Sequence, residues 1–154
     1  MTTASVRPST GKNTGSGNIP DLKLSVFHCF NALPDLSVLD IPGCELSSIN
    51  LPCSSILREV VLLKAFESGA DAVVVLVCPE GSCDYQQGNL RAKKRVERVQ
   101  KLLKEIGIGN DRLRIHNLSR QDIDTAEKII RQTLADLKKT GQNPAPQPVG
   151  SEKR

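Results

Sequence analysis

The sequence predicts an α/β fold: a small three-layer domain with a mostly parallel sheet of about four strands, similar to flavodoxin-like and Rossmann-like domains. Three observations lead to this prediction. Short apolar segments rich in β-branched residues alternate with segments whose apolar residues recur at helical spacing. The segment Ala72–Val77 is apolar throughout, as expected for a central strand that is covered on both faces. The intervening segments are long enough to hold the crossover connections that parallel strands need.

The first part of the chain contains two of the predicted strands. Leu24–Cys29 is the first, and Leu46–Leu51 is the second main strand. Residues 30–45 lie between them and contain a Pro42-Gly43 turn. Within this stretch, Leu36–Ile41 could form a short strand of its own.

A helix is expected next, because Ser54 or Ser55 can cap its first turn with a side-chain oxygen. Gly69 ends this helix at a C-cap position. The positions expected to face the sheet recur at helical spacing, and they are Leu57, Val60, Val61 and Lys64–Ala65. The apolar run Ala72–Val77 then forms the central strand.

The second half of the chain holds two longer helices around one strand. Leu90–Ile106 is the first helix, ended by glycines, with a buried stripe of Val96, Val99, Leu103 and Ile106. Leu113–Leu118 alternates as a half-buried strand. The last helix covers roughly Arg120–Lys139, with start signals at Ser119 and Asp122 and inward positions Ile123, Ala126, Ile130, Leu134 and Leu137.

Composition divides the 154 residues into one folded domain, about residues 21–140, and two tails. Residues 1–20 and 141–154 have little apolar bulk, so they are expected to be disordered. The tails also hold four basic residues and one acidic residue, a net +3 of the formal +4, which leaves +1 for the domain. This balance, with 3% aromatic residues and no Trp, does not indicate a nucleic-acid partner.

The sequence predicts a cytoplasmic protein with no membrane association. No apolar run approaches the roughly 18–20 residues that span a bilayer, and no apolar stretch follows the N-terminal basic residues as in a secretion signal. Five cysteines without such a signal indicate a reducing compartment, where thiols bind metals or do chemistry more often than they form structural disulfides.

The positions of four cysteines indicate where the functional site lies. Cys29, Cys53 and Cys78 each stand where an apolar segment ends, and Cys83 follows Cys78 after four residues. Parallel strands end at one edge of a sheet, which is where open α/β sheets bind ligands. Four converging thiolates suit either tetrahedral Zn²⁺ or a [2Fe–2S] cluster. Cys44 is interpreted as a bystander.

Other features of the sequence bear on catalysis and partners. No phosphate-binding glycine loop, zinc-protease helix or nucleophile elbow is found, so no catalytic residues are assigned and a non-catalytic role is expected. The segment 91–104 carries seven basic residues against Glu97. Such a run is typical of a solvated outer face, and it could also dock an acidic partner.

From about Leu24 to Gly141 the chain resembles the iron–sulfur (delta) subunit family of methyl-viologen-reducing hydrogenases. The match is closest in LLKAFESGADAVVVLVCPEGSCDYQQGN (62–89) and RAKKRVERVQKLLKEIGIGNDRLR (91–114). These segments are similar to the family's Leu-Lys-Ala-Phe, Gly-Ala-Asp, a strand, Cys-x4-Cys-x-Tyr-x-x-Gly-Asn and an Arg-rich helix. The chain departs from the family's cysteine-rich N-terminal motif, because it reads His28-Cys29-Phe30-Asn31-Ala32 there, and Ser54-Ser55-Ile56 replaces Ser-Gly-Arg.

The resemblance implies a [2Fe–2S] cluster bound by Cys29, Cys53, Cys78 and Cys83. It also implies a subunit that relays electrons from a hydrogenase or another donor to a heterodisulfide-reductase-like partner, which does the substrate chemistry. Two other hypotheses remain open: a zinc-bound or metal-free assembly module, and a thiol/disulfide redox protein that uses Cys78 and Cys83. Iron colours a protein and zinc does not, whereas a thiol enzyme needs one reactive cysteine of low pKa.

Overall fold

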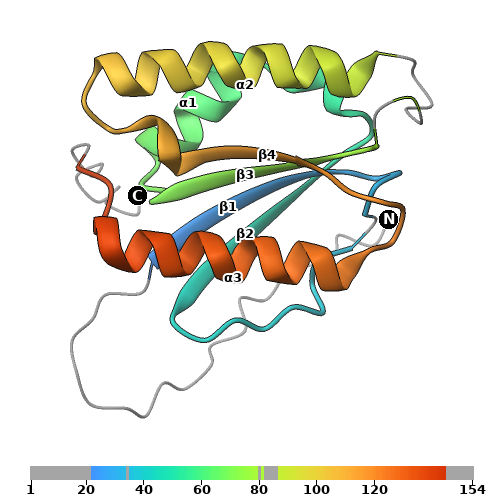
Figure 1. Cartoon of the computed structure of the whole chain (residues 1–154), viewed down its shortest axis with the longest axis horizontal. Helices are drawn as coiled ribbons and strands as arrows, with labels where there is room; N and C mark the ends of the chain where they lie inside the picture. The colour runs from blue at the N-terminus through green and yellow to red at the C-terminus, as the bar shows by residue number, and fades with distance from the viewer. Residues whose placement is uncertain (1–21, 34, 80, 82–86, 145–154) are drawn as a thin grey trace, which may run out of the picture.

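Parallel strands form the centre of the molecule (Figure 1). The computed structural model describes residues 22–33, 35–79, 81 and 87–144, and within these ranges the sheet has four strands. They are β1 (Leu22–Cys29), β2 (Cys44–Leu51), β3 (Ala72–Val77) and β4 (Leu113–Asn117), in the spatial order β2-β1-β3-β4. All their pairings are parallel, so the predicted α/β class and sheet are confirmed.

Helices cover both faces of the sheet and complete the three layers (Figure 1). One face carries α1 (Glu59–Glu67) and α2 (Gly88–Glu105), and the other carries α3 (Ile123–Thr140). Two short 3₁₀ turns, η1 (Ser54–Ile56) and η2 (Asn110–Arg112), complete the described elements. In these residues no helix is long and apolar enough to cross a membrane.

The burial pattern of β3 explains why the fold forms around it. Its six side chains, Ala72–Val77, are all buried, and they alternate between two hydrophobic clusters on the two faces. One cluster joins β3 to α3 and to the segment between β1 and β2, and the other joins it to α1 and α2. The strand therefore has the central position and the bounds that its continuous apolar run predicts.

The connections leave β1 and β3 toward opposite faces. The segment after β1 packs Leu33, Leu36 and Ile41 into the cluster on the α3 side. The segment after β3 leads into α2 on the other side. A ligand-binding crevice of an open α/β sheet lies where neighbouring strands diverge in this way, beyond their carboxyl ends. The order β2-β1-β3-β4 matches the first four strands of the flavodoxin-like order, whose crevice lies between β1 and β3.

Two of the predicted local structures are wrong. Leu36–Ile41 forms turns and coil, because Leu36 and Ile41 fill the core under α3 and the segment makes no strand pairing. The predicted helix from Ser54 is divided: η1 ends at Ile56, Leu57 and Arg58 have extended backbones, and α1 begins at Glu59.

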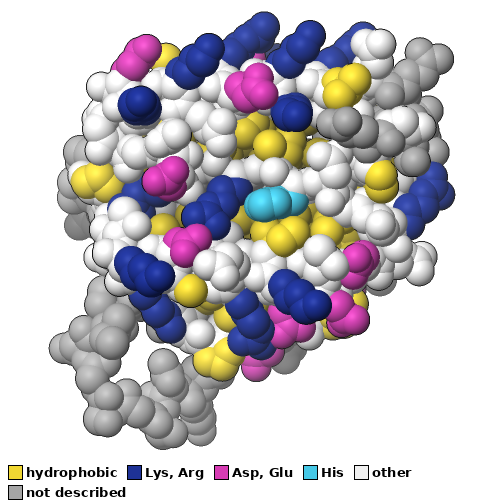
Figure 2. All heavy atoms as spheres, viewed as in Figure 1, with side chains coloured by type: hydrophobic (Ala, Val, Ile, Leu, Met, Phe, Trp, Pro, Cys, Tyr) yellow, Lys and Arg dark blue, Asp and Glu magenta, His cyan; other side chains and the backbone are white. Residues whose placement is uncertain are grey.

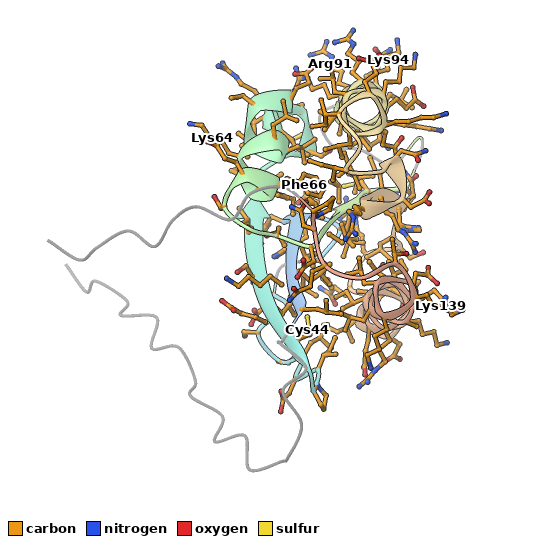
Figure 3. The ribbon with its side chains drawn as sticks, turned by 90° about the vertical axis from the view of Figure 1, so that its left-hand side faces the viewer. Cys44, Lys64, Phe66, Arg91, Lys94 and Lys139 are labelled. Atoms are coloured by element: carbon orange, nitrogen blue, oxygen red, sulfur yellow. The ribbon has the colours of Figure 1, made fainter. Side chains whose placement is uncertain are left out.

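This division turns the helix relative to the predicted face. Leu62 and Phe66, one helical turn apart, are buried against the sheet, while Val60 and Val61 are exposed. Figure 3 shows Phe66 between α1 and the sheet. Gly69 follows α1 with φ of 103°, in agreement with its predicted C-cap role.

The buried positions and caps of α2 and α3 agree more closely with those predicted from the sequence. Val96, Val99 and Leu103 of α2 are buried, whereas Ile106, predicted to be buried, lies beyond the end of the helix and is exposed. The cap of α3 is Asp122, whose Oδ1 accepts the N–H of Thr125 at 3.0 Å.

Residues just after α3 are fastened to the fold. Arg112 is buried, and its guanidinium donates to the carbonyl oxygens of Gly141 and Gln142 at 3.0 and 2.9 Å. The backbone N–H of Asn143 donates to Asp71 Oδ1 at 2.7 Å. Burial lowers the pKa of Arg112, and the charge of Asp71 opposes this. Most of both expected tails, residues 1–20 and 145–154, falls outside the described residues.

Candidate metal centre

Cys29 and Cys78 lie together at the carboxyl ends of β1 and β3. Their Sγ atoms are 3.5 Å apart, and both side chains are almost completely buried, with 1% and 2% exposed. Ala32 packs against them in a small cluster of its own. The structure therefore brings two of the four predicted ligands to the crevice between β1 and β3, as the parallel topology predicts.

The separation of the two sulfur atoms fits a shared metal ion. A disulfide bond is about 2.05 Å long, so this pair is not bonded. Two thiolates that bind one tetrahedral ion at about 2.3 Å lie about 3.8 Å apart. The Cys29–Cys78 distance of 3.5 Å is close to that value. The donors are soft sulfur atoms shielded from water, which suits zinc or an iron–sulfur group.

Two asparagine side chains hold the backbone of Cys78. Asn89 Nδ2, at the start of α2, donates to the carbonyl oxygens of Cys78 and Pro79 at 3.1 and 3.0 Å. Asn117 Nδ2, at the end of β4, donates to the same Cys78 oxygen at 2.7 Å. These bonds replace the sheet pairing that ends at Val77, so the residue that carries the thiol keeps a fixed backbone.

Sequence reasoning did not assign a role to either asparagine. Asn89 belongs to the Gly-Asn pair of the motif, and it is buried at a helix start, which is an unusual place for an amide. Its burial is known only from the structure, so the sequence held no signal for this role. The role of Asn117 depends on the parallel register, which places it opposite Val77.

A tight turn holds the residues after Cys29. The N–H groups of Ala32 and Leu33 donate to the carbonyl oxygen of Cys29 at 3.0 and 2.9 Å. His28 Nδ1 lies 2.6 Å from the carbonyl oxygen of Leu33, which can only accept, so Nδ1 carries the proton. Burial lowers the pKa of His28. This histidine serves the turn and not the thiol pair.

Cys53 is buried in the turn that follows β2. Its Sγ accepts the N–H of Ser55 at 3.4 Å, so a cysteine takes the capping place expected for Ser54 or Ser55. Arg95 of α2 closes the other end of η1, because its guanidinium donates to the carbonyl oxygens of Ser55 and Leu57 at 2.5 and 2.7 Å. The turn that carries Cys53 is thus fixed at both ends.

Ser54 is an exception in this well-bonded turn. Its side chain is 1% exposed, and among the described residues its Oγ has no hydrogen-bond partner. Leaving a buried hydroxyl unpaired costs about 1–3 kcal/mol. An unsatisfied polar atom next to a candidate ligand is compatible with a bound group that carries hydrogen-bond acceptors.

The structure does not assemble a complete set of metal ligands. Within the described ranges, no three His, Cys, Asp or Glu side chains are grouped so that they could hold a metal ion. Cys53 is therefore at the same edge without joining the Cys29–Cys78 pair, and Cys83 lies outside the described residues. Cys44 begins β2 and pairs with Leu22 at the start of β1, so it lies at the opposite edge of the sheet from the Cys29–Cys78 pair.

The outer side of α2 is strongly basic. Figure 2 shows Lys and Arg side chains along the edge of the molecule that α2 forms, and Figure 3 shows Arg91 and Lys94 pointing away from the sheet. The exposed basic residues are Arg91, Lys93, Lys94, Arg98, Lys101 and Lys104. Arg98 forms an ion pair with Glu59 of α1 at 3.1 Å. This face is available for contacts because it lies opposite the face that packs on the sheet.

Together, the flavodoxin-like strand order and the buried thiols at its crevice define a small α/β protein with a cysteine-based site. The chain belongs to the family described as methyl-viologen-reducing hydrogenase, delta subunit, whose model matches residues 35–141.

The relatives carry related descriptions. The chain is 38% identical over 96 residues to a vhu iron-sulfur subunit of the F420-non-reducing hydrogenase of Methanocaldococcus jannaschii. The matched residues make up 62% of this chain and 72% of the relative. It is 31% identical over 93 residues to the iron-sulfur subunit of the F420-non-reducing hydrogenase of Archaeoglobus profundus. That match covers 60% of this chain and 68% of the relative. It is also 33% identical over 104 residues to one subunit of the ferredoxin:CoB-CoM heterodisulfide reductase of Methanosarcina mazei, covering 68% of this chain and 12% of that protein.

Proposed function

We propose that this chain is an electron-transfer subunit whose [2Fe–2S] cluster is bound by Cys29, Cys53, Cys78 and Cys83. The observation that carries the proposal is the buried Cys29–Cys78 pair, whose 3.5 Å separation suits two thiolates on one metal ion. The names of the hydrogenase relatives, which are iron-sulfur subunits, support the same kind of cofactor.

The four cysteines would serve as two pairs. In a cluster with two irons, each iron takes two thiolates, so one close pair and a second pair farther along the edge are expected. Cys29 and Cys78 are the close pair, which leaves Cys53 and Cys83 for the other iron. Cys53 is held at the same edge by η1, which makes it available to complete the set.

The bound cluster would supply one-electron transfer, and the chain supplies the environment for it. Cys29, Cys53 and Cys78 are all less than 5% exposed, so the protein keeps water from their sulfur atoms. Asn89 and Asn117 keep the backbone of Cys78 in place without adding a charge. The shell around a metal site controls its solvent access and dielectric, and through them its reduction potential.

The electrons would pass between a hydrogenase or another donor and a heterodisulfide-reductase-like partner. The match to the heterodisulfide reductase of Methanosarcina mazei supports this, because 104 residues similar to this chain form part of that longer protein. A domain that is joined to its partner in one protein often contacts that partner as a separate subunit in another. A thiol site also requires reducing conditions, so the proposal includes a cytoplasmic location.

A thiol/disulfide enzyme is less well supported. Its nucleophilic sulfur must be reached by a substrate disulfide, and such cysteines are partly exposed. Of the two cysteines in this hypothesis, Cys78 is nearly inaccessible, and Cys83 lies outside the described residues. Structural zinc fits the sulfur geometry as well as iron does, so the metal itself has to be measured.

The deciding experiment is anaerobic purification of the full chain, followed by assays of iron, acid-labile sulfide and zinc and by visible spectroscopy. We expect about two irons and two sulfides per chain, with absorption bands that bleach on reduction. Zinc, or no metal after anaerobic reconstitution with iron and sulfide, would contradict the proposal and leave the assembly module.

A further inference from the structure

The buried hydroxyl of Ser54 is the feature that the fold leaves unexplained. Among the described residues, the buried side-chain atoms without a hydrogen-bond partner are Ser54 Oγ and His116 Nε2. His116 is only partly buried in β4, whereas Ser54 is enclosed on all sides. A hydroxyl can rotate to meet almost any acceptor, so one that is buried without a partner needs an explanation, and a redox role or a bound group is among those that apply.

The surroundings of Ser54 belong to the thiol site. Ser54 follows Cys53 directly and opens η1, the turn that Cys53 Sγ caps. This turn packs against α2, and the first turn of α2 is tied to Cys78 through Asn89. Ser54 is therefore buried in a turn that is next to Cys53 in the chain and that packs against the helix whose start is bonded to Cys78.

We propose that Ser54 donates a hydrogen bond to a sulfur atom of the group that the cysteines hold, and that this bond raises the group's reduction potential. The inference rests on the proposed function. Thiolate and sulfide sulfur accept hydrogen bonds, and hydrogen bonds to sulfur are among the factors that set cluster potentials. Reduction adds negative charge to the sulfur atoms, so the Ser54 proton stabilises the reduced form more than the oxidised form.

The alternative is that Ser54 simply fills space. In that case Ser54→Ala removes an unsatisfied buried hydroxyl, which stabilises the metal-free protein and leaves the potential of the loaded protein unchanged. The two explanations therefore differ in a quantity that packing alone does not move.

The test is a redox titration of the anaerobically loaded full chain, compared at equal iron content with Ser54→Ala, Ser54→Thr and Ser55→Ala. We expect Ser54→Ala to lower the ratio of reduced to oxidised protein about tenfold at a fixed potential, a shift of about 59 mV for one electron. Ser54→Thr keeps the hydroxyl and should restore the wild-type midpoint. Ser55→Ala is the matched control, because Ser55 engages Cys53 and Arg95 through its backbone only.

An unchanged midpoint in Ser54→Ala would overturn the inference, and Ser54→Gly provides a second hydroxyl-free variant if the alanine protein does not fold. Pulsed electron paramagnetic resonance gives an independent measurement on the wild type. An exchangeable proton coupled to the reduced cluster is expected there and should be lost with the hydroxyl; its absence in the wild type would also overturn the inference. Failure of the wild type to take up iron and sulfide would instead contradict the proposed function.

Discussion

Two cysteines of this chain have the same thiol and very different surroundings. Cys78 follows a fully buried strand, and two asparagine amides bind its carbonyl oxygen. Cys44 begins β2 beside Leu22, at the other edge of the sheet. They therefore form a matched pair for testing which thiols serve the site.

Replacing Cys78 by serine should remove the metal. We expect Cys78→Ser to lose nearly all of its iron and visible absorption, because a hydroxyl is a poor substitute for a thiolate on a soft metal. Cys44→Ser should keep both. The measurement is iron content and the visible spectrum after anaerobic purification of each variant. Loss of colour on changing Cys44 but not Cys53 would contradict the ligand assignment.

His116 should make the apoprotein less stable in mild acid. Burial lowers its pKa below the ordinary 6.5, and the charge of Arg114 lowers it further. Below pH 6.5 the unfolded chain therefore binds the proton more readily than the folded chain does. The stability linked to this group is complete above that pH and is lost as the pH falls toward the lower folded pKa.

Urea unfolding of the metal-free protein at about pH 7.5 and about pH 5.5 measures this effect. His116→Gln should lose less stability between these pH values than the wild type does. His28 has a lowered pKa too and stays in both proteins, so the difference reports His116 alone. Equal losses in the two proteins would show that His116 does not contribute.

At the scale of elements, the sequence determined some bounds well because the decisive interactions are local. The six apolar residues of β3 stand between Asp71 and Cys78, and the strand has the predicted bounds. The α1 region could not be predicted in the same way. Ser54 and Ser55 look like helix caps, yet the turn that replaces the first helical residues is fixed by Arg95, which lies 40 residues from Ser55 in the sequence.

The candidate site likewise has features that the sequence predicts and features that only the structure shows. The meeting of Cys29 and Cys78 follows from the rule that parallel strands end at one edge, so the sequence could predict it. The support from Asn89 and Asn117 could not be predicted, because each amide reaches the carbonyl oxygen of Cys78 from a distant position, 11 and 39 residues away in the sequence. The unpaired hydroxyl of Ser54 likewise becomes visible only once its burial is known.

The basic face of α2 should guide association with an acidic partner surface. We expect the double variant Lys94→Glu and Lys101→Glu to associate with the proposed heterodisulfide-reductase-like partner about ten times more slowly at low salt, because charge complementarity mainly sets association rates. Raising the salt concentration should reduce the difference. Stopped-flow mixing or surface plasmon resonance measures the rates.

The matched control is Lys138→Glu with Lys139→Glu, since these residues are exposed at the end of α3 on the other face. The control changes the net charge by the same amount. If both double variants slow association equally, overall charge rather than the α2 face is responsible.

At the scale of the whole molecule, residues beyond α3 should contribute to stability. Ending the chain after Thr140 removes two of the four carbonyl partners of the buried Arg112, those of Gly141 and Gln142, and keeps those of Asp71 and Ile108. It also removes the Asn143 bonds to Asp71, Phe66 and Ala70. We expect the free energy of unfolding to fall by about 2–4 kcal/mol. A chain that ends after Pro144 keeps these bonds and should unfold like the full protein. Urea denaturation of the metal-free proteins compares them, and equal stability of the two shortened chains would contradict this role.

The hydrogen bonds of Asn143 also determine on which side of the sheet the described fold ends. Leu22 begins β1, and Asn143 is bound to Asp71 just before β3, so the described part of the chain begins and ends at the amino edge of the sheet. The thiols lie at the carboxyl edge. The first and last described residues therefore lie on the side of the sheet away from the thiols. The thiol edge is built by residues from the interior of the described fold, at the ends of β1 and β3, and not by its first or last residues.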